Sequence, residues 1–100
     1  MKIKFRQTGG FAGLVKSADI DTEQLSDNES GMVQAWIEHA NFWSMSAPSG
    51  RSLPDQEQYS ITIETDGQSR TMRMGRSAVP TELKPLVEFV ASRATYEKRR

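Results

Sequence analysis

Apolar and polar residues alternate at the start of the chain and again beyond residue 58, a pattern typical of strands with one buried face. Ile3 and Phe5 are flanked by charged residues, and residues 59–63 place an apolar side chain at every second position. Asp66-Gly67 follows the second alternating run and is a strong signal for a two-residue hairpin turn. The sequence therefore predicts a strand at both places and a hairpin partner over residues 70–75.

A glycine-rich segment follows the first predicted strand. Gly9 and Gly10 can adopt positive φ without a Cβ clash and predict a tight turn. Residues 11–18 keep a weaker alternation and are expected to return as the second strand, whereas residues 19–21 are expected to leave the sheet. A turn does not require the large side chain of Phe11, which leaves two interpretations open. This ring either projects toward a partner or folds back and covers the core.

Two helices are predicted from apolar residues spaced three and four apart. Ser26 and Glu29 have the spacing of a capping box at the start of the first helix, and Asn41 is suited to the left-handed position that ends it. Phe42 is expected to fold back as a hydrophobic closure. The apolar face of the first helix comprises Met32, Val33, Trp36, Ile37 and Ala40, and that of the second comprises Leu83, Leu86, Val87 and Val90, with Pro80 and Pro85 at an irregular start.

The order of the predicted elements is ββαββα. Two hairpins and two helices favour an α+β fold, a two-layer sandwich in which an antiparallel four-stranded sheet carries both helices on one face. Residues 44–56 are rich in serine, proline and glycine, have no periodic pattern and are predicted to form a long loop. No linker or internal boundary interrupts the pattern, so residues 1–100 are expected to form one domain.

Composition narrows the classes of function. Thirteen basic residues balance thirteen acidic ones, whereas a nucleic-acid-binding domain normally carries a basic excess. The outward positions of the predicted strands, Glu64 among them, offer no aromatic rings for stacking on bases. No apolar stretch approaches the roughly 18 residues of a membrane span, no signal-peptide pattern opens the chain, and cysteine is absent. We therefore expect a cytoplasmic protein that binds neither nucleic acid nor membrane.

The residues offer little for catalysis or metal binding. His39 is the one histidine, and its place near the end of the first predicted helix favours interaction with the helix dipole over a role as ligand or base. Asp19, Asp21 and Glu23 alternate as in a calcium loop, but the glycine and glutamate that such a loop needs at its sixth and twelfth positions are missing. We expect no enzyme activity, no metal site and no cofactor.

The predicted surface carries the remaining candidates for function. The glycine-rich tip around Phe11 and the loop from Met45 to Leu53 are candidate contact segments. Trp36 lies on the apolar face of the first helix and is interpreted as a core residue, and we favour the same interpretation for Trp43. A binding module is therefore the favoured class.

Several motifs along the chain occur together in one known family. They are Phe5-x4-Gly10-Phe11-Ala12-Gly13, Asp21 and Leu25 at their spacing from it, the pair Phe42-Trp43, the strand Tyr59-Ser60-Ile61-Thr62-Ile63, and Val79-Pro80-x2-Leu83-x2-Leu86. In these motifs nearly the whole chain resembles the emfourin family, small bacterial inhibitors of thermolysin-like metallopeptidases such as protealysin.

The resemblance implies a proteinaceous inhibitor that occupies the active-site cleft of a thermolysin-like metallopeptidase. Without cysteine, and with its histidine on a predicted helix, the chain is poorly suited to ligate the target's zinc. We therefore expect a steric, competitive block by the glycine-rich tip and the loop over 44–54, with Phe11 in a hydrophobic specificity pocket. The predicted partner-binding residues are Gly9, Gly10, Phe11, Ala12, Gly13, Leu14, Arg51 and Leu53.

A second class of function stays open. The same segments would serve a non-inhibitory protein–protein interaction domain, such as an immunity or adaptor protein. A metallopeptidase gene beside this one would favour inhibition. In either class we expect the free chain to be a monomer.

Overall fold

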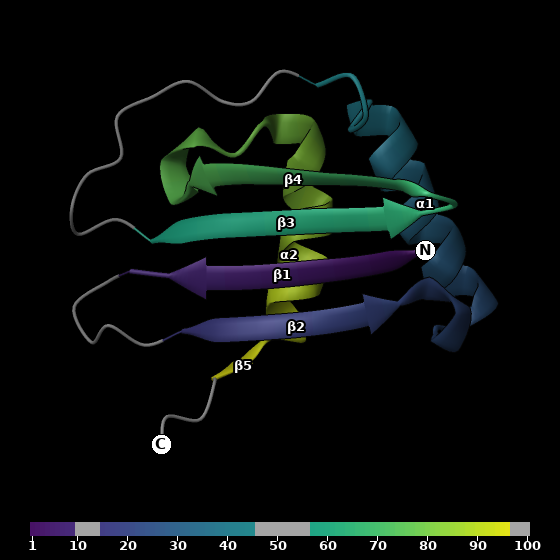
Figure 1. Ribbon diagram of the computed structural model, residues 1–100, viewed down its shortest axis with the longest axis horizontal. Coiled ribbons are helices and arrows are strands. Elements are labelled where there is room, and N and C mark those ends of the chain that lie inside the picture. Colours follow the sequence, from purple (N-terminus) through teal and green to yellow (C-terminus); the bar gives the residue numbers. More distant parts are fainter. Residues whose placement is uncertain (10–14, 46–56, 97–100) are drawn as a thin grey trace.

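The computed structural model describes residues 1–9, 15–45 and 57–96 of the chain. Within them, five strands form one sheet in the order β4-β3-β1-β2-β5, and every neighbouring pair is antiparallel. Both α-helices lie on one side of this sheet, and its other face is open (Figure 1). The elements are β1 (Lys2–Thr8), β2 (Lys16–Asp21), η1 (Thr22–Gln24), α1 (Asp27–Ala40), β3 (Gln58–Thr65), β4 (Gln68–Gly75), η2 (Arg76–Ala78), η3 (Thr81–Leu83), α2 (Lys84–Ser92) and β5 (Thr95–Tyr96), where η marks a short 3-10 helix.

The predicted two-layer α+β architecture is confirmed, but the prediction of a four-stranded sheet is wrong. β5 adds a fifth strand by pairing with Lys16 and Ser17 at the start of β2. After α2 ends, the amide of Ala94 bonds back to the carbonyl of Ala91 at 3.1 Å, and the chain continues along the sheet edge. A strand of two residues is too short to produce a periodic pattern in the sequence.

The second strand lies further along the chain than its weak alternation predicted. β2 spans residues 16–21, and residues 19–21 pair with β1 instead of leaving the sheet. Of the predicted strand over 11–18, residues 11–14 lie outside the described residues. The register sets Lys4 opposite Asp19 and Lys2 opposite Asp21. Opposite charges directly across an antiparallel pair stabilise that register, which explains why the acidic end of β2 stays in the sheet.

The first helix begins and ends as predicted. The Ser26 hydroxyl accepts from the Glu29 amide at 3.1 Å, which is the N-cap bond that the spacing predicted, and it donates to the Glu29 carboxylate at 3.3 Å. At the other end Asn41 has a φ of 54°, and the Phe42 amide donates to the carbonyl of Ile37 at 3.2 Å. The hydrophobic closure by Phe42 is confirmed, because its ring is fully buried.

One residue assigned to the apolar face of α1 is exposed. Met32 is 39% exposed, so its prediction as a core residue is wrong. Successive residues are about 100° apart around the helix axis, so Met32 points away from the side on which its neighbour Val33 is buried. Trp36 is half-buried and packs on Phe89 of α2 with ring centroids 5.7 Å apart, and Trp43 packs edge-on against Phe42 at 5.7 Å. Both tryptophans thus border the core.

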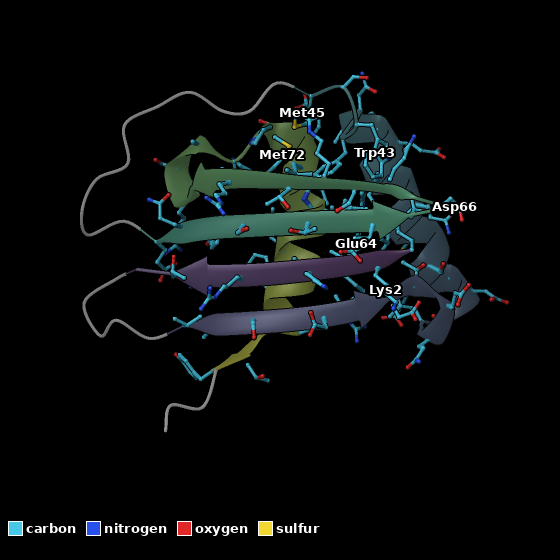
Figure 2. The ribbon with its side chains drawn as sticks, viewed as in Figure 1. Lys2, Trp43, Met45, Glu64, Asp66 and Met72 are labelled. Carbon is cyan, nitrogen blue, oxygen red and sulfur yellow. The ribbon has the colours of Figure 1, made fainter. Side chains whose placement is uncertain are left out.

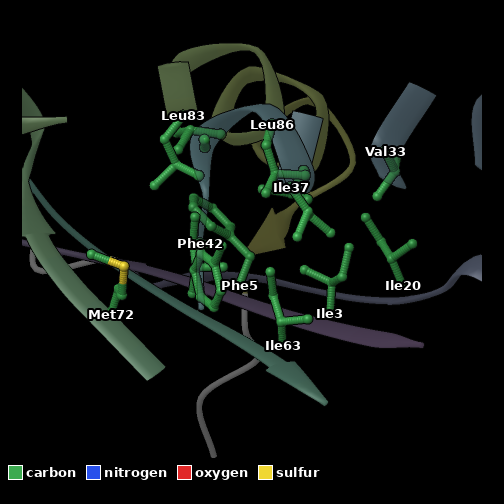
Figure 3. Packing of buried hydrophobic residues seen from close by; sticks show 14 of the residues in the cluster. Ile3, Phe5, Ile20, Val33, Ile37, Phe42, Ile63, Met72, Leu83 and Leu86 are labelled. Carbon is green, nitrogen blue, oxygen red and sulfur yellow. The ribbon is translucent and has the colours of Figure 1, made fainter. Parts of the chain in front are cut away.

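The second hairpin and the second helix follow their predictions. Asp66 and Gly67 both have positive φ, 36° and 80°, which is the backbone of a tight primed turn between β3 and β4. η3 supplies the irregular start expected before α2. In Figure 3 Phe42 lies beside Phe5, between the strands and the helices. The buried apolar residues are Ile3, Phe5, Ala18, Ile20, Val33, Ile37, Ala40, Phe42, Ile61, Ile63, Met72, Met74, Leu83, Leu86, Val87 and Val90.

Candidate protein-binding surface

One of the eight predicted partner-binding residues lies in the described part of the chain. Gly9 follows β1 directly, is exposed and has a φ of 96°, a backbone conformation that favours glycine. The positive φ fits the glycine, but the predicted tight turn at Gly9 and Gly10 is wrong, because Gln7 pairs with Lys16 and the connection between the two strands is therefore longer. The other predicted residues, Gly10, Phe11, Ala12, Gly13, Leu14, Arg51 and Leu53, lie outside the described residues.

The sheet register brings the ends of the two predicted binding segments together. Thr8, which precedes Gly9, pairs with Gln58, the first residue of β3. Lys16, at the start of β2, pairs with Gln7 on the other side of β1. The described residues on both sides of residues 10–14 therefore lie at one end of the sheet, and so does the residue that follows residues 46–56 (Figure 1). We call this region, residues 7–9, 16, 57–58 and 75–76, the loop end of the sheet.

Two contacts hold Glu57, the residue that precedes β3, against Arg76. The Arg76 amide donates to the carbonyl of Glu57 at 3.0 Å, and its Nη1 lies 3.4 Å from Glu57 Oε2. Partial burial raises the pKa of the neighbouring Tyr59 hydroxyl, an effect that Arg76 opposes and Glu57 reinforces. The backbone where the long segment ends is thus fixed to the end of β4.

The start of the same segment is held by an arginine that the sequence pattern did not single out. Arg70 lies on β4 with its side chain on the helix side, as do those of Met72 and Met74. Its Nη1 donates to the carbonyl of Phe42 at 2.6 Å, and its Nη2 donates to the carbonyl of Met45. The guanidinium also lies 5.8 Å from the centre of the Phe42 ring. The signal in the sequence was a charged residue at an inward position of an otherwise alternating strand.

The open face of the sheet is polar throughout the described residues. Thr62 and Thr71 share a hydrogen bond of 2.8 Å across β3 and β4, and Lys4 Nζ lies 3.7 Å from Glu64 Oε1. Figure 2 labels Lys2 and Glu64 at the end of this face remote from the loop end. A shallow recess of about 340 Å³ indents the same face at the loop end, lined by Arg6, Thr8, Gln58, Tyr59, Ser60 and Arg73.

The described residues carry no arrangement for metal chemistry. No group of three or more histidine, cysteine, aspartate or glutamate side chains comes together in residues 1–9, 15–45 and 57–96. His39 is exposed in the last turn of α1, where the sequence placed it. In the same part of the chain, no helix has the length and apolar character that crossing a membrane requires. The surface offers hydrogen-bond donors, charges and two segments that end side by side.

Comparison with known proteins gives one match. The sequence model of the Emfourin family matches residues 5–91, which include the second half of β1, the whole of β2, β3, β4 and α1, and all of α2 but its last residue. No curated protein and no solved structure matches the chain.

Proposed function

Because the chain belongs to the emfourin family, a family of metallopeptidase inhibitors, we propose that it inhibits a thermolysin-like zinc metallopeptidase. The partner is then a protein, and the chain needs no cofactor of its own. We place it in the cytoplasm as a monomer when free.

The inhibition proposed is steric and competitive. The glycine-rich tip, residues 9–14, and the loop over residues 44–54 enter the active-site cleft together. The observation that supports this proposal is the pairing of Thr8 with Gln58, because the residue before one segment and the residues after the other then lie side by side at the loop end of the sheet. Two segments presented by one rigid support bind with less loss of conformational freedom than two independent loops.

Within this arrangement, the apolar tip residues provide the anchor. Phe11 occupies a hydrophobic specificity pocket of the peptidase, with Leu14 beside it and with Arg51 and Leu53 as secondary contacts. Burying a phenylalanine side chain is worth about 1.5–3 kcal/mol, whereas nanomolar binding requires about 12 kcal/mol. The second segment is therefore needed for tight inhibition.

The experiment is a titration of a purified thermolysin-like peptidase from the same genome with this protein, using a peptide substrate and pre-incubation. We expect stoichiometric loss of activity in the wild type. Phe11→Ala should raise the inhibition constant about ten- to a hundredfold, which corresponds to the lost burial of one phenylalanine.

Met32→Ala is the matched control, because Met32 is an exposed apolar residue on α1, away from the open face. It should leave the inhibition constant within about twofold of wild type. Full activity of the peptidase at a large molar excess of the wild-type protein would contradict the proposal. The chain would then be an interaction domain with a different partner.

A further inference from the structure

The outer edge of β4 presents a row of main-chain groups that point away from the sheet. β4 is an edge strand next to β3, and a two-residue turn joins the two (Figure 1). In an antiparallel pair, residues that exchange both main-chain bonds alternate with residues whose N–H and C=O groups point the other way. The two-residue turn makes Thr65 and Gln68 a bonded pair. The main-chain groups of Ser69, Thr71 and Arg73 therefore point away from β3, and we call them the β4 edge row.

Two contacts agree with this alternation. The Arg76 amide donates to the carbonyl of Glu57 at 3.0 Å, and these two residues continue the series of bonded pairs. The hydroxyl oxygens of Thr62 and Thr71 lie 2.8 Å apart, which fits a non-bonded pair, because side chains are closer there. All three residues of the β4 edge row are exposed, and within the described part of the chain no hydrogen bond reaches their outward main-chain groups.

The usual devices that block an edge strand are missing from β4. Natural edges are commonly shortened, bulged or interrupted by proline. β4 has eight residues, contains no proline and pairs with β3 one to one without a bulge. The strand at the other edge of the sheet, β5, has two residues. An inward-pointing charge also protects some edges, but Arg70 donates to the carbonyls of Phe42 and Met45. The β4 edge row is thus able to accept a further strand.

Since β4 finishes at the loop end, beside the segments assigned to the peptidase cleft, we infer that the β4 edge row pairs with an extended segment of the peptidase next to that cleft. The inference rests on the proposed function and names a second contact with the same partner. Strand addition gains its affinity from main-chain hydrogen bonds, so the added segment is extended and has no proline at its pairing positions.

A second copy of the chain is a poorer occupant of this edge. β4 contains two arginines and no acidic residue. Pairing two copies of β4 would therefore bring the arginines of both strands together, and like charges across a strand pair are destabilising. A segment of another protein carries no such penalty.

The first test compares two proline substitutions in one row across the sheet. The register sets Thr71 opposite Thr62. Thr62 lies opposite Lys4, which lies opposite Asp19 of β2. The alternation of bonded pairs therefore turns the amides of Thr71 and Asp19 outward at opposite sides of the sheet. Proline lacks this N–H and is tolerated at edge positions where the N–H faces solvent.

Thr71→Pro is expected to raise the inhibition constant about ten- to a hundredfold, because it removes a main-chain donor and leaves its acceptor on the peptidase unpaired. Asp19→Pro is the matched control and should leave the inhibition constant within about twofold of wild type. Thermal melts check that both variants are folded. Equal inhibition constants for the two variants would overturn the inference while leaving the inhibition itself standing.

The second test uses neither a peptidase nor a variant. The 15N-labelled protein is titrated with the blocked peptide acetyl-Thr-Val-Thr-Val-Thr-amide, and the same peptide with its inner nitrogens methylated is the control. Amide signals of Ser69, Thr71 and Arg73 should shift with the unmethylated peptide only. Their absence, or equal shifts with both peptides, would overturn the inference.

Two further outcomes of this titration separate the possible occupants. Shifts of the same amides on raising the protein concentration without peptide would assign the edge to a second copy and would also overturn the inference. Peptide-dependent shifts in a protein that inhibits no peptidase would support strand addition at the β4 edge row and contradict the proposed function instead.

Discussion

Gly31 and Gly67 lie at positions where an added Cβ would meet no atom within 4 Å, yet their backbones differ. Gly31 is inside α1, whereas Gly67 has a φ of 80° in the turn between β3 and β4. Gly31→Ala should therefore raise the free energy of unfolding by about 0.5–1 kcal/mol, through higher helix propensity. Gly67→Ala should lower it by about 1 kcal/mol, because a side chain is strained at positive φ. Urea denaturation of both variants measures the two effects, and a shift of the same sign in both would contradict this explanation.

Ionisation of the Tyr59 hydroxyl should make the stability of the folded protein depend on pH in the alkaline range. Partial burial raises the pKa of its hydroxyl above the usual value near 10, so the folded state keeps the phenol proton to higher pH than the unfolded state does. Above pH 10 the folded state then binds more protons, and the free energy of unfolding falls as pH rises. Tyr59→Phe should show a smaller fall between pH 9 and pH 11 in urea denaturation. An identical slope in the variant and the wild type would show that other groups cause the decline.

At the scale of elements, β4 carries two arginines on opposite faces. Arg70 donates to the carbonyls of Phe42 and Met45 on the helix side, whereas Arg73 is exposed on the open face. Arg70→Met leaves two part-buried carbonyls without their charged donor and should lower the free energy of unfolding by about 2–3 kcal/mol. Arg73→Met is the matched control and should stay within about 0.5 kcal/mol of wild type. Chemical denaturation compares the two, and equal losses would show that Arg70 does not hold the chain after α1.

The elements that the sequence predicted well are those with local signals. The N-cap at Ser26, the left-handed end at Asn41 and the turn at Asp66-Gly67 each depend on a few adjacent residues, and the structure confirms all three. β2 and β5 were misplaced or missed for the opposite reason. The position of β2 depends on its register with β1, and β5 exists through its pairing with β2.

The candidate site also has features that local sequence signals predicted and features that they could not predict. Glycine chemistry predicted a positive φ after β1, which Gly9 has, whereas the pairing of Gln7 with Lys16 does not fit the predicted two-residue turn. The adjacency of the ends of the two predicted binding segments could not be predicted, because Thr8 and Gln58 are far apart in the chain and meet only through the register of β1 and β3. Arg70 likewise acts on carbonyls that precede it by 25 and 28 residues. Contacts at such separations leave no periodic signal in one sequence.

At the scale of the whole molecule, the two layers separate stability from binding. The apolar core lies between the sheet and the helices, whereas the loop end lies at one end of the sheet and the recess beside Ser60 and Arg73 lies on its open face. Substitutions on the open face can therefore change partner binding with little effect on folding. Arg70 lies on the helix side instead, where it connects the core at Phe42 with the start of the long segment.

This connection predicts how long the chain stays intact when it is incubated with the peptidase of the proposed function. A protease cuts a folded protein where the chain opens locally, so a segment held at both ends should resist cleavage. Glu57 is held by Arg76 at one end of the segment and Met45 by Arg70 at the other. During prolonged incubation with an equimolar amount of the peptidase, the wild type should stay intact and Arg70→Met should be cut within residues 44–56, with peptidase activity returning as cleavage proceeds.

Val33→Ala separates local from global opening in this experiment. Val33 is fully buried in the core on α1, and truncating it should lower the free energy of unfolding by roughly 2 kcal/mol, comparable to Arg70→Met, while leaving the contacts of Met45 in place. Mass spectrometry of the digestion products over time then identifies the opening event. Cleavage confined to residues 44–56 in Arg70→Met, with slower or dispersed cleavage in Val33→Ala, is the expected result. The same products at the same rate in both variants would mean that the peptidase cuts the globally unfolded chain, and that Arg70 protects the segment only through overall stability.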